Sequence, residues 1–158
     1  MMEKMKYVCF KIRQSNKIKE TDVRPMGRST RGVKGMNIAK EDNVISIIKV
    51  NPESNLLTLS ENGYGKRTNI SEFGGQKRGG KGVIALNTSE RNGMMVAAVQ
   101  VLDGDEVMLI GNKGTLIRTQ VDQISVIGRN TQGVKVVSTR ENEKLVDAVG
   151  FKESLDEE

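Results

Sequence analysis

The residue types best suited to chemistry gather in one seven-residue stretch near the middle of the chain, Gln76-Lys77-Arg78-Gly79-Gly80-Lys81-Gly82. Glycines let main-chain N–H groups come close to phosphate oxygens. Lys77, Arg78 and Lys81 can neutralise phosphate charge and release counterions. The side-chain amide of Gln76 can donate to a phosphate or sugar oxygen. The stretch therefore predicts a clamp for a phosphate backbone, with a solvated, flexible turn as the alternative.

Other chemistry is disfavoured by the residues that surround this stretch. Residues 75–81 come one position short of a P-loop, because Gly82 stands where that motif needs Ser or Thr. The run Val83–Leu86 predicts a strand where the motif needs a helix. The chain has one cysteine and no histidine, which argues against Cys/His zinc sites and His-based acid-base catalysis. The sequence predicts no catalytic residue, metal or cofactor.

The outline of the stretch occurs three times, as an Arg followed four residues later by Gly and then Val. The three copies begin at Arg28, Arg78 and Arg129. An apolar residue lies five positions before each Arg and a cation eleven positions before it. A repeat of this length is typical of propellers and solenoids. We therefore expect three units at residues 1–52, 53–103 and 104–152, followed by an acidic tail at 153–158.

Each copy predicts about four short strands. Val44–Val50 is rich in β-branched residues and predicts a buried strand. Asn62-Gly63 predicts a hairpin turn, and Thr115–Val121 predicts the return strand of a second hairpin. No window shows a sustained helical period. The expected fold class is all-β, a propeller-like array of about three four-stranded blades in an open or incomplete ring.

Charge points to a nucleic-acid partner. The chain has 25 Lys+Arg and 20 Asp+Glu, and its last eight residues hold four of the acids. A basic body favours nucleic acid or another anionic partner. Aromatic residues, on which single-stranded bases stack, are rare, so the backbone of a duplex is the expected target. In addition to the seven-residue stretch, six cations are predicted to contact the duplex: Arg28, Arg31, Lys34, Lys66, Arg67 and Arg129.

The chain shows no apolar run long enough to span a bilayer and no secretory signal at its start. These observations predict a cytoplasmic protein with no membrane partner. The acidic tail at 153–158 is either a solvated end or a competitor of DNA for the basic surface.

These motifs resemble the C-terminal DNA-wrapping domain of DNA gyrase A and, more distantly, its topoisomerase IV counterpart. Residues 76–82 resemble the gyrase-A box of that family, and residues 22–28, 62–68 and 127–133 resemble its blade motifs. The resemblance covers residues 17–152. It implies a β-pinwheel, in which neighbouring blades exchange strands and a basic rim bends DNA. The family domain usually has five or six blades with the box in the first, whereas here the box lies in the middle of three copies.

The resemblance further implies a module that supports negative supercoiling by an ATP-dependent type II topoisomerase, which is an isomerase. Its partners would be double-stranded DNA, the breakage-reunion part of gyrase A, and gyrase B. Nothing in the sequence resembles the catalytic tyrosine region of that enzyme. An alternative is a β-scaffold for protein interaction, which docks on a larger topoisomerase chain without wrapping DNA, because incomplete propellers expose unpaired strand edges.

Overall fold

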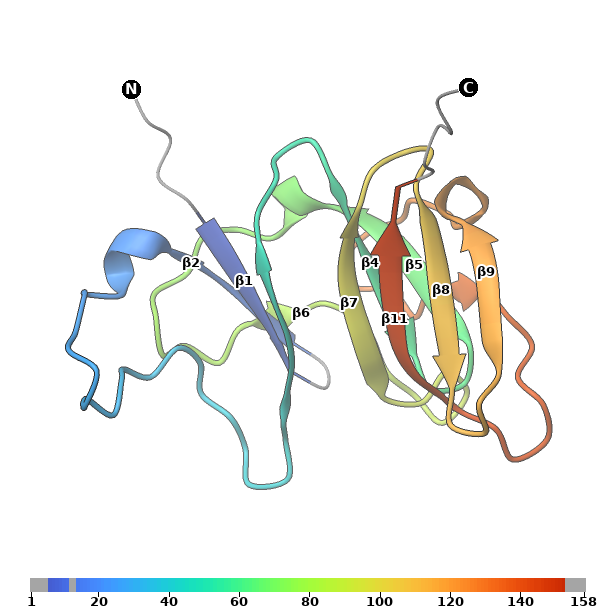
Figure 1. Cartoon of the computed structure of the whole chain (residues 1–158), viewed down its shortest axis with the longest axis horizontal. Coiled ribbons are helices and arrows are strands. Elements are labelled where there is room, and N and C mark those ends of the chain that lie inside the picture. Colours follow the sequence, from blue (N-terminus) through green and yellow to red (C-terminus); the bar gives the residue numbers. More distant parts are fainter. Residues whose placement is uncertain (1–5, 12–13, 153–158) are drawn as a thin grey trace.

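Strands make up nearly all of the regular structure. The computed structural model describes residues 6–11 and 14–152, which form eleven strands and three 3-10 turns of three residues each (Figure 1). The strands are β1 (Lys6–Lys11), β2 (Gln14–Lys19), β3 (Val44–Lys49), β4 (Asn55–Ser60), β5 (Tyr64–Asn69), β6 (Val83–Ile84), β7 (Met95–Val101), β8 (Glu106–Gly111), β9 (Leu116–Gln120), β10 (Val134–Lys135) and β11 (Leu145–Phe151). The turns are η1 (Glu20–Asp22), η2 (Ile70–Glu72) and η3 (Val121–Gln123). The all-β prediction is confirmed, and no helical segment in the described part of the chain is long and apolar enough to cross a membrane.

The strands form three antiparallel sheets that follow one another along the molecule (Figure 1). Their strand orders are β3-β1-β2-β6, β10-β5-β4-β7 and β11-β8-β9. β6 belongs to the second sequence repeat and β10 to the third, so the outer strand of a sheet comes from the next repeat. A sheet and a sequence repeat are therefore different units. Within the described residues the third sheet has three strands instead of the four that were predicted.

Glycine turns close the hairpins on which the sheets are built. The predicted Asn62-Gly63 turn joins β4 to β5, and Gly63 has a φ of 82°. The turn between β8 and β9 contains Gly114, which also has a φ of 82°. Glycine adopts this left-handed conformation without the clash that a Cβ atom would cause. Both predicted hairpins are confirmed by the pairing of their strands.

The core lies in two layers, one between each pair of neighbouring sheets. Successive residues of β4 point to opposite sides, so Leu56 joins the first layer and Leu57 the second. Phe73 and Ile124, two of the three apolar residues that recur five positions before the repeated Arg, are almost completely buried in these layers. The third, Val23, is 42% exposed. Among the described residues no sheet precedes the first repeat to cover it.

β3 differs from the prediction of a buried strand over Val44–Val50. The strand forms, but Val44 and Ile47 are 53% and 66% exposed. Ile45 and Ile48 pack against the first core layer. Alternate side chains of a strand face opposite sides, and only one side of β3 meets a neighbouring sheet in the described structure. The prediction of a buried strand was therefore wrong for the side that carries Val44 and Ile47.

Candidate nucleic-acid interface

The stretch 76–82, hereafter the box loop, runs from the second repeat to the edge strand of the first. The main-chain N–H of Gln76 donates to the carbonyl of Lys17 at 2.7 Å. The N–H of Gly79 donates to the carbonyl of Gly35 at 2.8 Å. After the loop, β6 pairs with β2. The main chain of the box loop is therefore anchored on the first repeat at several points along its length.

Close contact explains the glycine at the end of the box loop. Gly82 has a φ of 89°, and a Cβ atom on it would lie 2.4 Å from the carbonyl oxygen of Ser15 on β2. Gly133 repeats the arrangement, with a φ of 78° and a Cβ position 2.7 Å from the carbonyl oxygen of Gly65 on β5. Any larger residue would be strained and would clash. These glycines allow the outer strand to join the preceding sheet.

The three cations of the box loop are exposed, but they differ in what they contact. Arg78 donates from Nε to the carbonyl of Asp22 at 3.0 Å and from Nη1 to the carbonyl of Lys34 at 2.9 Å. Lys77 and Lys81 are exposed, with no hydrogen-bond acceptor found for their ammonium groups among the described residues. Arg78 thus links two repeats, whereas the two lysines present their charge to solvent.

Arg129 is half-buried and repeats the linking role in the third copy. Its Nη1 donates to the carbonyl of Ile84 at 2.5 Å, and its main-chain N–H donates to the Glu72 carboxylate at 2.9 Å. Ile84 is the counterpart of Lys34, to which Arg78 donates one repeat earlier. In the second and third copies the arginine that defines the repeated sequence pattern therefore holds its loop to the preceding repeat.

Lys66, a predicted DNA contact, is completely buried. Its Nζ donates to the carbonyls of Gly128 at 2.9 Å and Thr131 at 3.1 Å, and also to the carbonyl of Arg129. Burial away from water lowers the pKa of Lys66 to about 8, although the nearby Glu72 carboxylate raises it. The side chain grips the loop of the third repeat from inside, so it cannot contact a DNA backbone in this conformation.

Arg67, the neighbouring predicted contact, is also directed inward. Its side chain is 8% exposed and lies 2.6 Å from the Asp103 carboxylate. Its Nε donates to the carbonyl of Ile124 at 2.7 Å. Lys17 lies at the same position of the first repeat and donates from Nζ to the carbonyl of Ile70 at 3.2 Å. In the first two repeats the cation eleven positions before the repeated Arg thus joins neighbouring repeats, whereas Arg118 in the third donates to the Glu106 carboxylate of its own repeat.

Asn16 helps to hold the box loop in place, although the sequence pattern did not single it out. Its Nδ2 donates to the carbonyls of Gly35 at 3.1 Å and Lys77 at 3.4 Å. Asn16 and Lys66 both lie twelve residues before a repeated Arg, and each reaches the loop of the following repeat. The shared spacing could have identified this pair in the sequence. A search for repeated charges misses it, because asparagine is neutral and lysine is a cation.

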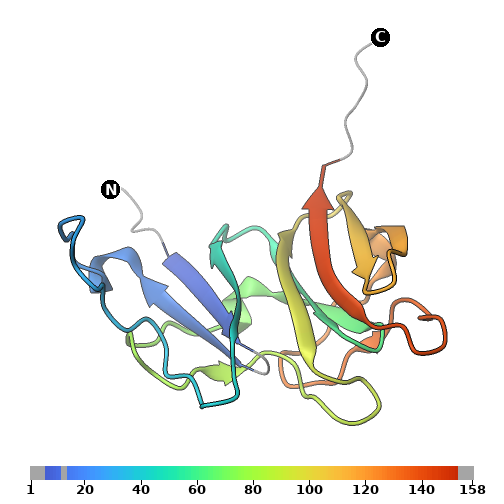
Figure 2. The ribbon, with the colours of Figure 1, turned by 60° about the horizontal axis from the view of Figure 1, so that its bottom comes forward.

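The three repeated loops form one row. The N–H of Asn37 donates to the carbonyl of Gly80, and the N–H of Asn87 donates to the carbonyl of Thr131, each at 2.9 Å. The first bond joins the loop of the first repeat to the box loop, and the second joins the second repeat to the loop of the third. Figure 2 shows these loops following one another along the molecule.

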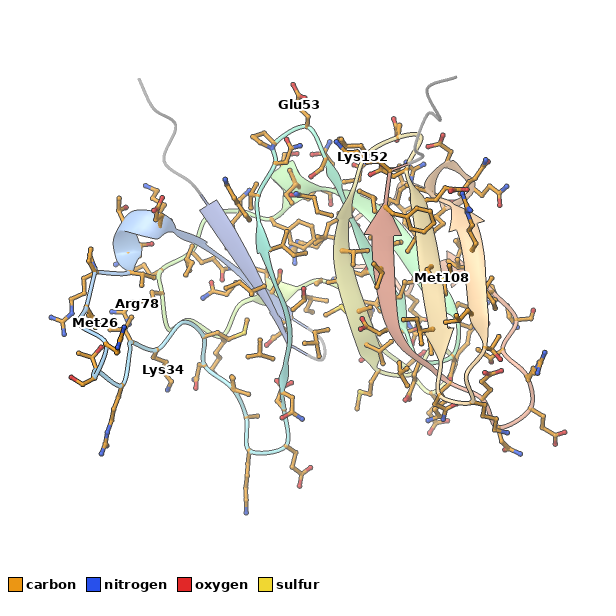
Figure 3. The ribbon with its side chains drawn as sticks, viewed as in Figure 1. Met26, Lys34, Glu53, Arg78, Met108 and Lys152 are labelled. Atoms are coloured by element: carbon orange, nitrogen blue, oxygen red, sulfur yellow. The ribbon has the colours of Figure 1, made fainter. Side chains whose placement is uncertain are left out.

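Arg28, Arg31 and Lys34 are exposed on the loop of the first repeat. Figure 3 shows Lys34 and Arg78 close together at the end of the molecule that also carries Met26. The structure therefore brings the predicted cations of the first loop next to the box loop. It places Arg129 one repeat further along, and it directs Lys66 and Arg67 into the joint between the second and third repeats.

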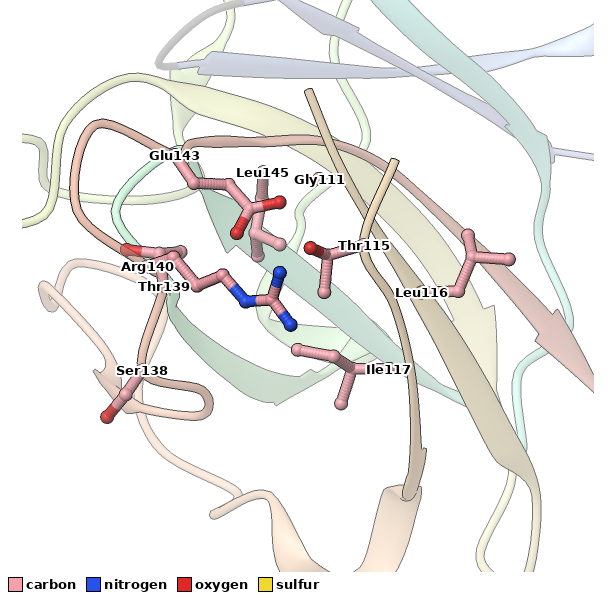
Figure 4. Close-up of a pocket in the computed structure, with 9 residues that line it drawn as sticks. All are labelled: Gly111, Thr115, Leu116, Ile117, Ser138, Thr139, Arg140, Glu143 and Leu145. Atoms are coloured by element: carbon pink, nitrogen blue, oxygen red, sulfur yellow. The ribbon is translucent and has the colours of Figure 1, made fainter. Parts of the chain in front are cut away.

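No group of three described His, Cys, Asp or Glu residues lies close enough to hold a metal ion among them. A pocket of about 330 Å³ lies beside β9, and Figure 4 shows Arg140 and Glu143 pointing into it near Thr115. The Thr115 hydroxyl has no histidine base to activate it. After the box loop, β6 stands where a P-loop would need a helix.

Comparison with known proteins identifies the family. A family model described as the DNA gyrase C-terminal domain, beta-propeller, matches residues 17–51, 54–101 and 105–149. The chain belongs to this family. It is 46% identical over 142 residues to the DNA gyrase A protein of Escherichia coli K12, covering 90% of this chain and 16% of that protein. It is 51% identical over 127 residues to the DNA gyrase A protein of Pseudomonas aeruginosa, covering 80% and 14%.

Two solved structures share this fold. A DNA gyrase A C-terminal domain superposes with a TM-score of 0.86 at 30% identity, covering 96% of this chain and 52% of that one. The C-terminal domain of DNA topoisomerase IV also gives a TM-score of 0.86, at 21% identity, covering 93% and 46%. The second likeness concerns the fold alone. The chain spans about a sixth of the E. coli protein and about half of the solved gyrase domain.

Proposed function

We propose that this chain binds double-stranded DNA along its row of loops and bends it, as a non-catalytic wrapping module of DNA gyrase A. The observation that supports the proposal best is the construction of the box loop. Its main chain is anchored on the first repeat, while Lys77 and Lys81 are exposed and bind no acceptor among the described residues. Because the loop is anchored, its main chain loses little conformational entropy when the lysines contact phosphates.

The row of loops offers a path for a curved duplex. Smoothly bending 20–30 base pairs costs on the order of 1–6 kcal/mol, and favourable phosphate contacts must offset this cost. Such contacts tolerate any sequence and weaken steeply with salt, because phosphates carry no base identity. The exposed cations available for them on the first two loops are Arg28, Arg31, Lys34, Lys77 and Lys81, whereas Arg78, also exposed, already donates to two carbonyls of the first repeat. Lys66 and Arg67 are left out of the proposal because both are buried.

The proposal extends to the enzyme of which such a module would be part. DNA bent on the loops would be presented to the breakage-reunion part of gyrase A and to gyrase B, which together would introduce negative supercoils. The module itself would need no cofactor and would break no bond, so its contribution would be the geometry of the DNA. This part of the proposal is supported by the family and by the 46% identity over 142 residues to a gyrase A protein, of which this chain covers 16%.

The test compares the salt dependence of duplex binding in two charge-matched variants. The first carries Lys77→Gln and Lys81→Gln in the box loop. The second carries Lys49→Gln and Lys152→Gln, which remove the same charge at other places. Lys49 lies on β3, at the opposite edge of the first sheet from β6. Lys152 follows β11, at the opposite edge of the third sheet from β9.

Binding to a short fluorescent duplex is measured by anisotropy over a range of salt concentrations. The slope of the logarithm of the association constant against the logarithm of the salt concentration is negative. Its magnitude decreases by about 0.9 for each phosphate that the protein no longer neutralises. The box-loop variant should therefore flatten the slope by roughly 1–2, while the control pair leaves the slope near that of the parent chain. Equal slopes in both variants would refute the clamp. Absence of any duplex binding would instead favour a scaffold that only docks on other proteins.

A further inference from the structure

Three side chains from separate parts of the chain meet at the outer edge of the second sheet. Tyr64 begins β5, Lys135 ends β10, and Arg91 lies in the loop between β6 and β7. The guanidinium carbon of Arg91 lies 5.1 Å from the centre of the Tyr64 ring, and its Nε donates to the Tyr64 hydroxyl at 3.2 Å. Lys135 lies directly opposite Tyr64 in the strand pairing, and opposite residues of an antiparallel pair point to the same side. A phenol and two cations therefore share one small surface, hereafter the tyrosine cluster.

The tyrosine cluster continues the row of loops. Arg91 belongs to the segment that follows the box loop and β6 along the chain. In this segment the N–H of Asn87 donates to the carbonyl of Thr131 at 2.9 Å, and Nδ2 of Asn92 donates to the carbonyl of Gln132 at 3.1 Å. These bonds hold the segment against the loop of the third repeat, which leads into β10. The cluster is thus attached to the same loops that carry the exposed cations.

The cluster lies at a position that stays accessible when another repeat follows it. Ile84 occupies this position in the preceding joint, because Ile84 and Lys135 are each the second residue of an exchanged strand. The third repeat follows Ile84, and Ile84 is still 39% exposed. Arg91 and Lys135 are both exposed, and Tyr64 is partly exposed. Their accessibility therefore comes from their place in the sheet.

No carboxylate offsets the two cations of the cluster. Neither Arg91 nor Lys135 forms an ion pair with a described Asp or Glu. The hydrogen bond from Arg91 lowers the pKa of Tyr64 below its usual 10.0, and the charges of both cations lower it further, although desolvation acts in the opposite direction. Two like charges held near one phenol repel each other, and an anion placed between them relieves that repulsion.

The Tyr64 hydroxyl has a proton left to donate. Its oxygen accepts from Arg91, and no described group accepts its own proton. A phenol hydroxyl can accept and donate at the same time. The Nη groups of Arg91 and the ammonium of Lys135 are donors as well. The cluster therefore presents only donors to its solvent side, an arrangement that matches the charged oxygens of a phosphate.

We propose that Tyr64, Arg91 and Lys135 together bind one phosphate of a DNA duplex, as a contact separate from the box loop. The inference rests on the proposed function, because the duplex supplies the phosphate. The Tyr64 hydroxyl donates to a phosphate oxygen, while Arg91 and Lys135 neutralise the phosphate charge. A duplex held at the box loop and at the cluster is fixed at two places along the row, which sets the direction in which it leaves the box loop.

The first variant, Tyr64→Phe, keeps the ring beside Arg91 and removes only the hydroxyl. Duplex binding is measured by anisotropy over the same range of salt concentrations. Binding should weaken about 2- to 10-fold at every salt concentration, because one hydrogen bond is lost. The salt slope should stay at the parent value, because no charge is removed. The bond between Tyr64 and Arg91 is exposed, so circular dichroism and thermal unfolding should match the parent chain.

The second variant carries Arg91→Gln and Lys135→Gln. It should flatten the salt slope by about 0.9, because the two cations neutralise the same phosphate. The control variant with Lys49→Gln and Lys152→Gln loses the same charge and should keep the parent slope. Adding Tyr64→Phe to the second variant should weaken binding less than it does in the parent chain, because the phosphate is no longer held there. An equal loss in both backgrounds would show that the three side chains share no phosphate.

A third measurement separates the DNA backbone from a free phosphate ion. Tyr7→Phe leaves Tyr64 as the only tyrosine of a chain that has no tryptophan, so fluorescence then reports on the cluster. Inorganic phosphate, added without DNA at constant ionic strength, should give no saturable change. A saturable change that disappears with Arg91→Gln and Lys135→Gln, together with unaltered duplex binding, would assign the cluster to a free ion and overturn the backbone contact.

The duplex measurements also separate this inference from the proposed function. Tyr64→Phe and the Arg91→Gln, Lys135→Gln variant could bind like the parent chain while the box-loop variant flattens the slope. The cluster contact would then be wrong and the proposed function would stand. A parent chain that binds no duplex would refute both.

Discussion

Replacing Lys66 tests how the loop of the third repeat is held. The side chain is completely buried and donates to three main-chain carbonyls of that loop. Burial lowers its pKa from 10.5 to about 8, because a charge loses its hydration when it leaves water. A pKa change of that size corresponds to roughly 3 kcal/mol between the charged and neutral forms. Lys66→Met removes this titration and leaves an apolar chain of similar length in its place.

The sign of the effect follows from proton binding. Below pH 8 both the folded and the unfolded chain keep the proton on Lys66, and the folded state bears the full cost of a buried charge. Between pH 8 and 10.5 the folded chain releases the proton while the unfolded chain keeps it. The free energy of unfolding therefore rises with pH in this window. By pH 9.5 the contribution of Lys66 should reach about 2 kcal/mol.

The assay is urea unfolding followed by far-ultraviolet circular dichroism at pH 7 and pH 9.5. The measured quantity is the change in unfolding free energy between the two pH values, compared between the parent chain and Lys66→Met. Other groups that titrate in the same range affect both proteins and cancel. Lys49→Met, at an exposed lysine, is the control and should behave like the parent. If Lys66→Met shows the same pH dependence as the parent chain, the buried lysine carries no such cost and the reasoning fails.

Two further substitutions test the joints between repeats. Gly82→Ala should destabilise the chain by about 2 kcal/mol or more, because the new Cβ would lie 2.4 Å from the Ser15 carbonyl oxygen in addition to the left-handed strain. Gly104 has a φ of 85° and open space around it, so Gly104→Ala introduces the left-handed strain alone and should cost about 1–2 kcal/mol. Thermal unfolding measures both losses of stability. Equal losses would show that the close approach at Gly82 is unimportant. Arg67→Met should lower stability by about 1–3 kcal/mol because it removes a buried hydrogen bond. The lost ion pair with the largely exposed Asp103 adds little to this value. Its salt slope for duplex binding should equal that of the parent chain, and a flatter slope would return Arg67 to the DNA surface.

The sequence was sufficient to predict the all-β fold, the hairpin at Asn62-Gly63 and the family. These features depend on local turn chemistry and on equal spacing, both of which are visible without coordinates. The burial of Lys66 and Arg67 was not predictable in the same way. A cation in a strand can face water or a neighbouring sheet, and composition is the same in both cases. Only the position of the next repeat decides between them.

The exchange of outer strands explains the other differences. Sequence repeats suggested units that each contain their own four strands, but β6 and β10 pair with the preceding sheet. Among the described residues, the loop of the first repeat therefore pairs with no sheet, and the third sheet has no fourth strand. The exposure of Val44 and Ile47, where a buried strand was predicted, has the same origin. Their counterparts are covered because another sheet precedes them.

The residues that repeat and the residues that contact DNA are then expected to differ. A position that carries the same residue type in every copy serves something that every joint needs, as Arg78 and Arg129 do when they hold a loop to the preceding repeat. Lys77 and Lys81 have Gly128 and Gln132 at their positions in the third copy, so the joint does not require their charge. Charge that the architecture does not need is available for phosphates, and it is concentrated on the first two loops. A duplex on this rim should therefore be held most strongly there and least by the third repeat.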